Sequence, residues 1–408
     1  MRSPSDRIRG YLTIAVLIGL LVFGGRQLGL LFSNSEMPLL HDYMEYWAAG
    51  KLNLEGENPY DPQRIREVQQ EAGLQVDMAI MMWNPPWTLS VVMPFGLLPA
   101  RIGQMVWILV QFVLVLFCSD RLWLRFGGSP SQRWIGWLLG VSFAPTGFLI
   151  GTGQIAGFCL LGLTGFLVFE KKRPLLAGMF AALTAIKPHL LSLFALVLIL
   201  QALTSCKGRR VFLGGLIVGV LAALLPLLSN PEVYSQYLEA LHAPSSANHK
   251  ALGVWEHPTL GSWLRKFTQG PFWVQLLPCL FAMVGMTMVT LRRGKSWDWG
   301  HELPEVVLFS LLAAPYGAWP FDLVLLLVPL IYLAIRIIES QQRKRILAFV
   351  LVWLVMNGVM YLKLFAGVST PYYVWVTPVW VGVFFACNRR RIGEPTLSGV
   401  GVCIQPDA

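Results

Sequence analysis

The sequence predicts an all-α protein that crosses a membrane many times, and three observations support this fold class. The chain has 408 residues, of which 55% are hydrophobic and only 13% are charged. Its mean hydropathy is +0.58. Long apolar runs, such as 11–32, 211–228 and 346–365, approach the ~20 residues that a helix needs to cross a bilayer. Because such runs are spread along the chain, we predict a polytopic membrane protein instead of a soluble domain with one anchor.

The net charge of +10 comes mainly from short basic clusters between the apolar runs. Such Lys and Arg clusters are typical of the cytoplasmic loops of membrane proteins. They lie at 2–9, 121–133, 171–173, 207–210, 292–295, 343–345 and 389–391. This distribution explains the positive charge by membrane topology, and we expect no nucleic-acid partner.

Placing every basic cluster on one side of the membrane predicts about twelve crossings, with both termini in the cytoplasm. Residues 11–32 are long for a signal peptide and lack a clear cleavage site, which predicts an uncleaved signal anchor. The other spans are predicted at 101–120, 134–150, 155–169, 174–203 (crossing twice), 211–228, 272–291, 303–337 (crossing twice), 346–364 and 372–386. The two double crossings turn near Lys187-Pro188-His189 and near 315–320, where proline interrupts a helix. Several short halves are also compatible with re-entrant helices.

This threading predicts one transmembrane domain over 1–391 and a short cytoplasmic tail over 392–408. Two large loops, 33–99 and 229–270, are predicted on the extracytoplasmic side. The membrane lipids are therefore the first expected partners of the chain.

The first outer loop is acidic within a basic chain, with nine acidic against three basic residues between Ser33 and Asn84. We expect a helix over 41–54 whose aromatic face, including Tyr43, Tyr46 and Trp47, lies in the headgroup region. A second helix is predicted to begin after Asp61 as N-cap, with Pro62 in its first turn.

Polar side chains from separate loops fall on the predicted outer face of the membrane. They are Asp42, Glu45, Asn58, Asn84, Gln154, Lys187, His189, His257, Arg265 and Asp322. Ionisable residues at membrane depth are costly and usually functional. Asp42 is the first candidate, because it begins the expected interfacial helix close to the end of the first span. Most other acidic residues of the loop are interpreted as solvated surface.

A series of short motifs, ordered along residues 40–340, resembles a known family. They are Asp42-Tyr43-x-x-Tyr46-x-Ala48-Ala49-Gly50, Gly56-x-Asn58-Pro59-Tyr60-Asp61, Asn84-Pro85-Pro86-Trp87, Gly153-Gln154, Ile186-Lys187-Pro188, Thr259-Leu260-Gly261-Ser262-x-Leu264-Arg265 and Ala314-Pro315-Tyr316-x-x-Trp319. Together they resemble glycosyltransferase family 87. Two stretches depart from the family pattern. Pro320-Phe321-Asp322 stands where the family often has a histidine after the tryptophan, and Glu256-His257-Pro258-Thr259 stands where Asn-Gln-Ser is common.

The resemblance implies a GT-C fold and an inverting hexosyltransferase of the bacterial plasma (inner) membrane. A mannose-like sugar would pass from a polyprenyl phosphate to a lipid or glycan acceptor at the extracytoplasmic face. Asp42 matches the acid of the family and is expected to act as general base. Lys187 matches the Lys-Pro motif and is expected to bind the leaving phosphate, with Arg265 and His189 as second choices.

The remaining candidates form a predicted substrate-binding set. Gln154 and Asn84 either bind sugar hydroxyls or cap turns, and Asp322 either orients the acceptor or pairs with Arg265 or His257. Trp319 either stacks on a sugar ring or belongs to an interfacial belt. The set is completed by Glu45, Tyr46, Asn58, Tyr60 and His257.

No metal-ligand pattern is apparent, and the six scattered cysteines include no CxxC pair. We therefore expect no metal and no cofactor besides the lipid-linked donor. Two alternatives remain open. A transporter or flippase of lipid-linked glycans would place ionisable groups near the bilayer midplane and show internal repeats. A glycan polymerase or ligase would share the outer site and the lipid donor.

Overall fold

A computed structural model describes residues 38–243 and 257–388, and over these ranges the chain is helical without any strand. The first predicted span, 11–32, and the predicted tail, 392–408, lie outside the described residues, as does 244–256 in the second outer loop. The all-α prediction is confirmed for the described part of the chain.

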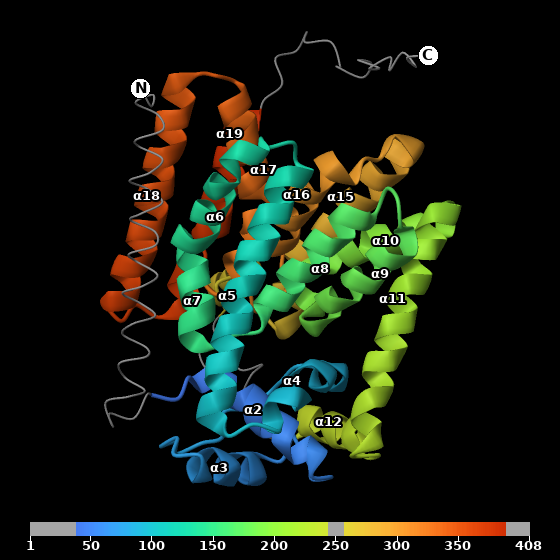
Figure 1. The fold of residues 1–408 in the computed structure, drawn as a ribbon, viewed down its shortest axis with the longest axis vertical. Helices are drawn as coiled ribbons and strands as arrows, with labels where there is room; N and C mark the ends of the chain where they lie inside the picture. The colour runs from blue at the N-terminus through green and yellow to red at the C-terminus, as the bar shows by residue number, and fades with distance from the viewer. Residues whose placement is uncertain (1–37, 244–256, 389–408) are drawn as a thin grey trace, which may run out of the picture.

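Four helices form a small layer at one end of a larger bundle (Figure 1). They are α2 (His41–Leu54), α3 (Pro62–Glu71), α4 (Leu89–Gly96) and α12 (Val233–His242). We call this layer, together with the segment 72–88 that joins α3 to α4, the end layer. The other α-helices are α5 (Ala100–Arg125), α6 (Arg133–Ser142), α7 (Ala144–Thr152), α8 (Ala156–Phe169), α9 (Pro174–Ala181), α10 (Ser192–Thr204), α11 (Cys206–Leu224), α14 (Leu260–Thr268), α15 (Leu277–Arg293), α16 (Trp299–Leu312), α17 (Leu327–Glu339), α18 (Arg343–Phe365) and α19 (Val376–Asn388). Short 3₁₀ helices join several of them, among them η1 (Pro86–Thr88), η3 (Ala182–Ile186), η4 (Pro188–Leu191), η5 (Leu225–Leu228) and η9 (Asp322–Leu326).

Within the described residues, fewer helices are long and apolar enough to cross a membrane than the twelve crossings that the sequence predicts. Within the described residues, four helices are long and apolar enough to cross a membrane. Residues 130–152 make a fifth if two helices that meet at a 56° bend count as one span. A 14-residue helix such as α8 is only about 21 Å long, against a hydrocarbon core of ~30 Å. The predicted twelve full crossings are therefore not confirmed, because several apolar segments are short or broken helices.

Helix α2 forms with the predicted bounds, but its aromatic face does not face lipid headgroups. Tyr43, Tyr46 and Trp47 are buried inside the protein, and the rings of Tyr43 and Tyr46 contact Trp107 of α5. Helix α4 covers α2 so closely that a Cβ on Gly50 would lie 2.9 Å from the Val92 carbonyl oxygen. The prediction of a headgroup-facing aromatic side was wrong, because protein packing satisfies the same apolar pattern.

Helix α3 begins as predicted. The Asp61 side chain accepts hydrogen bonds from the backbone N–H groups of Gln63, at 2.8 Å, and Arg64, at 3.3 Å. These bonds satisfy two of the donors that a helix N-terminus leaves unpaired. Because Ile65 and Val68 are buried, the polar side of α3 is left to face away from the core.

Charged residues join three loops of the bundle away from the end layer. Helix α5 runs from the end layer towards the opposite end of the bundle (Figure 1) and finishes at Arg125. The guanidinium of Arg125 lies 3.2 Å from Glu170, whose carboxylate also pairs with Lys207. Three of the predicted basic loops therefore meet, as expected if they share one side of the membrane.

Candidate functional site

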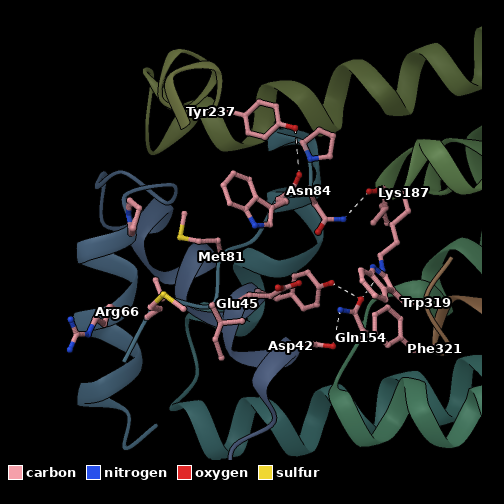
Figure 2. A pocket seen from close by; sticks show the side chains of 18 of the residues that line it. Asp42, Glu45, Arg66, Met81, Asn84, Gln154, Lys187, Tyr237, Trp319 and Phe321 are labelled. Atoms are coloured by element: carbon pink, nitrogen blue, oxygen red, sulfur yellow. Dashed lines mark hydrogen bonds between the residues drawn. The ribbon is translucent and has the colours of Figure 1, made fainter. Parts of the chain in front are cut away.

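A cavity of about 1430 Å³ lies between the end layer and the adjoining end of the bundle. The end layer contributes residues of α2, α3 and α12 together with the segment 77–85. The bundle contributes Gln154, the helix break at 186–189 and three residues between 316 and 321. Figure 2 shows how these side chains converge from segments that are far apart in the sequence.

Helix α2 brings three of the predicted residues to this cavity. Asp42, Glu45 and Tyr46 all line it, because positions i, i+3 and i+4 share one side of a helix. The two carboxyl groups are half-buried and the tyrosine is buried. An acidic pair therefore stands at the wall of a partly enclosed space.

Gln154 connects α2 to the bundle. Its Nε2 donates to Oδ2 of Asp42 at 2.9 Å, and its Oε1 accepts from the Tyr46 hydroxyl at 2.9 Å. The same Oε1 accepts from Nζ of Lys187 at 2.7 Å. One amide thus joins the acidic wall to the buried lysine (Figure 2).

The turn before Gln154 needs a glycine. Gly153 ends α7 with φ = 82°, in the left-handed region. A Cβ at this position would lie 2.6 Å from Cβ of Tyr43, and the Gly153 carbonyl accepts from Nε1 of Trp107 at 2.7 Å. The turn is therefore fixed against both α2 and α5.

We expect Gly153→Ala to lower the free energy of unfolding by about 1–3 kcal/mol, because it adds backbone strain and a contact with Tyr43 that is too close. Gly151→Ala is the matched control, since a Cβ there meets no atom within 4 Å. Thermal unfolding in detergent micelles compares the two variants. Equal stability would show that the turn tolerates a side chain.

Lys187 occupies the predicted break, between η3 and η4. It is 6% exposed, and its Nζ lies 2.7 Å from Oδ1 of Asp322. Asp322 is fully buried, and its Oδ2 accepts from the Trp319 backbone N–H at 3.1 Å. The predicted pairing of Asp322 with Arg265 or His257 is thus replaced by an ion pair with Lys187.

Two neighbouring side chains of the end layer bind the backbone at this break. Nδ2 of Asn84 donates to the Ile186 carbonyl at 2.9 Å, and Nε1 of Trp87 donates to the Ala185 carbonyl at 2.8 Å. The carbonyl groups that the interrupted helix leaves open are therefore satisfied by residues outside it.

Tyr60 and Asn58 support Asn84 from behind and do not line the cavity. The Tyr60 hydroxyl donates to the Asn84 carbonyl at 3.3 Å. The side-chain oxygen of Asn58 accepts from the Tyr60 backbone N–H at 2.9 Å. The two residues are thus placed to fix the loop that carries Asn84.

An aromatic wall closes the bundle side of the cavity. Trp319, Tyr316 and His189 line it, and the His189 and Tyr316 ring centroids are 5.4 Å apart. His257 lies behind this wall, with its ring 4.1 Å from Tyr316 and 5.0 Å from Trp319. The fold brings both predicted histidines, His189 and His257, close to the site, but only His189 lines the cavity.

Arg265 does not line the cavity. Its guanidinium lies over the Phe272 ring at 5.5 Å from the centroid, and its Nε donates to the Gly270 carbonyl at 3.4 Å. These contacts hold it within the α14 region, so it is a weaker candidate for a phosphate ligand than Lys187.

Several lining residues were not among the predicted site residues, including Arg66, Met81, Tyr237 and Phe321. Phe321 packs against the lysine, with Nζ of Lys187 4.8 Å from its ring centroid. Arg66 lies on the opposite side of the cavity from Lys187, and its side chain points away from the lysine (Figure 2). The exposed polar side of α3 was the available sequence signal for Arg66. The other three carry no signal that separates them from core residues.

The two carboxyl groups on α2 differ in electrostatic environment. Burial raises the pKa of Asp42, and the hydrogen bond from Gln154 and the positive charge of Lys187 oppose this rise. Burial, followed by the negative charge of Asp42, raises the pKa of Glu45 well above its ordinary value. Burial therefore favours the protonated form of both carboxyl groups, and the negative charge of Asp42 adds to this effect at Glu45.

Within 38–243 and 257–388, no group of three or more His, Cys, Asp or Glu residues is arranged to hold a metal ion. Metal independence stays a prediction.

The profile of glycosyltransferase family 87 matches residues 83–315, which is more than half of the chain. Comparisons with curated proteins and with solved structures give no match. The matched range contains Asn84, Gln154 and Lys187, whereas Asp42 and Asp322 lie outside it. The roles of those two residues therefore rest on the geometry of the cavity.

Proposed function

The chain belongs to glycosyltransferase family 87, and on this premise we propose that it transfers a hexose from a polyprenyl phosphate to a lipid or glycan hydroxyl. The observation that carries this proposal is the joining of Asp42 to Lys187 through one amide at the wall of a large cavity. A base and a buried cation are the two groups that such a transfer needs.

In the proposed reaction, an acceptor hydroxyl attacks the anomeric carbon of the donor sugar. The new C–O bond forms as the bond between that carbon and the phosphate oxygen breaks, so the anomeric configuration inverts. The hydroxyl proton passes to the carboxylate of Asp42, and the polyprenyl phosphate leaves with the bonding electron pair. A well-placed general base contributes ~10²–10⁴-fold to such a step.

Lys187 is proposed to stabilise the leaving phosphate. Its ammonium group has three N–H donors, and Gln154 and Asp322 accept from it in the protein. Because Lys187 also lines the cavity, the remaining donor is available to a phosphate oxygen. Such a bond is strongest where water is excluded.

The other lining residues are proposed to recognise the sugar and the acceptor. A protonated Glu45 can donate to a sugar hydroxyl, and Asn84 keeps a side-chain carbonyl for the same purpose. Trp319 offers a ring face for stacking, and His189 completes this side. Asn58, Tyr60 and His257 support these groups from behind. Mannose is the first sugar to test.

We propose that the cavity opens to the extracytoplasmic face of the bacterial plasma membrane. The joined basic loops around Arg125 and Lys207 lie away from the end layer, and basic loops favour the cytoplasm. This arrangement also supports a single GT-C-type domain with both termini in the cytoplasm. A reporter fused after Ser33 tests it, since a cytoplasmic signal would reverse the orientation.

The function is tested with purified protein in proteoliposomes and a panel of labelled donors. We expect a new glycoside from a polyprenyl monophosphate hexose, without added metal or cofactor, and none from the matching polyprenyl diphosphate sugar. Movement of the labelled lipid between leaflets without a new glycoside would favour the flippase. Transfer of a preassembled glycan from a diphosphate would favour the polymerase or ligase.

A further inference from the structure

The side-chain amide of Gln154 is almost fully occupied by contacts inside the protein. An amide has two acceptor positions on its oxygen and two N–H donors on its nitrogen. Tyr46 and Lys187 use both acceptor positions, and Asp42 uses one donor. Gln154 is also only 6% exposed. At most one N–H of Gln154 is left for a substrate, so this side chain is poorly suited to bind sugar hydroxyls.

The orientation of this amide is fixed by the lysine. A lysine ammonium donates and cannot accept hydrogen bonds, so the atom that Lys187 contacts at 2.7 Å must be the amide oxygen. The nitrogen then faces Oδ2 of Asp42 at 2.9 Å. The Gln154 amide therefore occupies Oδ2 of Asp42, and the side chain of Thr152, the last residue of α7, also hydrogen-bonds to this carboxylate.

Asp322 fixes the lysine in turn. Its Oδ1 contacts Nζ of Lys187, and its Oδ2 accepts from the Trp319 backbone N–H. Both oxygens are engaged, and the side chain is fully buried. Asp322 is thus a counter-ion below the cavity surface and is not placed to orient an acceptor.

We infer that Gln154 is a positioning residue for Asp42: held by Lys187 and Tyr46, it binds Oδ2 and orients the carboxylate for the acceptor hydroxyl, while Asp322 positions Lys187. This inference rests on the proposed role of Asp42 as general base. It changes Gln154 and Asp322 from predicted substrate ligands into residues that act through the base and the lysine.

The hydrogen bond from Gln154 to Asp42 affects the pH dependence of transfer. The charged and titratable groups that act on Asp42 are His41 and Glu45 of α2, Lys187 at the helix break and Asp322 of η9. Burial raises the pKa of Asp42, and the Gln154 hydrogen bond is the largest influence that lowers it. Loss of that bond raises the pKa further. Because the reaction needs the carboxylate, the acid limb of the pH profile must then move to higher pH.

The test compares Gln154→Met with the wild type across pH. We expect the acid limb of kcat/KM to move up by about one pH unit or more, with a loss of about ten-fold below it. The KM for the donor should change little. An unmoved acid limb with a raised donor KM would instead make Gln154 a sugar ligand and overturn the inference.

Two further variants keep the result interpretable. Gln154→Glu preserves the shape and the acceptor oxygen but replaces the N–H donor with a negatively charged oxygen beside Asp42, so it should move the acid limb in the same direction and further than Gln154→Met. Gln111→Met is the matched control, because Gln111 is a buried glutamine of α5 without a hydrogen-bond partner among the described residues. Gln111 does not line the cavity, so the pH profile of Gln111→Met should equal that of the wild type.

An infrared titration separates this inference from the proposed function. The protonated-carboxyl band that is present in the wild type and absent from Asp42→Asn reports Asp42 without any turnover. In Gln154→Met this band should persist to higher pH, and an unchanged titration would overturn the positioning role. If Asp42→Asn still transferred sugar, the proposed base would be wrong whatever the infrared titration gave.

Discussion

Replacing Asp42 with asparagine is expected to lower the rate of sugar transfer by ~10²–10⁴-fold. Asparagine has nearly the same shape and can still accept the hydrogen bond from Gln154, but it cannot take a proton from the acceptor. The KM for the donor should change little, because Lys187 keeps its partners. Initial rates at saturating donor and acceptor measure the effect.

Asp61→Asn is the matched control for this substitution. Asp61 belongs to the same acidic loop but caps α3 and does not line the cavity. Asparagine is an equally good N-cap residue, so this variant should retain both stability and transfer. Wild-type rates in Asp42→Asn would exclude Asp42 as the base and make Glu45 the next candidate.

On acidification, the wild-type protein should lose transfer activity at a higher pH than it would if Asp42 had the pKa of an ordinary aspartate. Because the pKa of Asp42 is raised by burial, the folded protein binds this proton more tightly than a free aspartate does. As the pH falls through that raised pKa, the carboxylate is lost and transfer declines. An acid limb in the ordinary aspartate range would contradict this assignment.

Asp322→Asn is expected to lower the free energy of unfolding by ~3–5 kcal/mol. The change removes the counter-ion at 2.7 Å from Lys187 and leaves a buried ammonium group without compensation. In Lys187→Met/Asp322→Asn the charge is gone as well, so most of the stability should return. Transfer should stay low in the double variant, because the leaving phosphate has lost its cation.

Glu339→Gln provides the comparison for this experiment. Glu339 pairs with Arg336 at 3.1 Å, but both side chains are about half exposed, and such pairs contribute only about 0–1 kcal/mol. Thermal unfolding in detergent micelles compares all variants. A double variant no more stable than Asp322→Asn, or one that transfers sugar normally, would contradict the assigned role of the ion pair.

Local sequence signals predicted the elements that carry the site. The spacing of Tyr43, Tyr46 and Trp47 predicted helix α2, and the Asp61-Pro62 pair predicted the start of α3. The burial of the aromatic face was not predictable, because an apolar stripe suits lipid headgroups and protein packing equally well. The packing of α4 at Gly50 and of Trp107 of α5 against this face distinguishes the two.

The contacts between the site residues were harder to predict than the identity of those residues. The threading placed Lys187 and Asp322 on the same face, but they are 135 residues apart, and nothing local to either one specifies the other. Hydropathy likewise counted apolar segments without revealing which of them form helices of only 10–17 residues. Arg265 fitted a motif, yet its contacts with Phe272 and Gly270 keep it out of the lining.

The interrupted helix at Lys187 also affects how the proposed lipid-linked donor would reach Asp42. Trp87 and Asn84 are bonded to the carbonyl groups of Ala185 and Ile186. Lifting the end layer off the bundle would break both bonds and leave two carbonyl groups unpaired, at roughly 1–3 kcal/mol each. The end layer and the bundle, which enclose the cavity, are therefore expected to move as one body. Substrate exchange is then easier through a lateral opening than through a hinged lid.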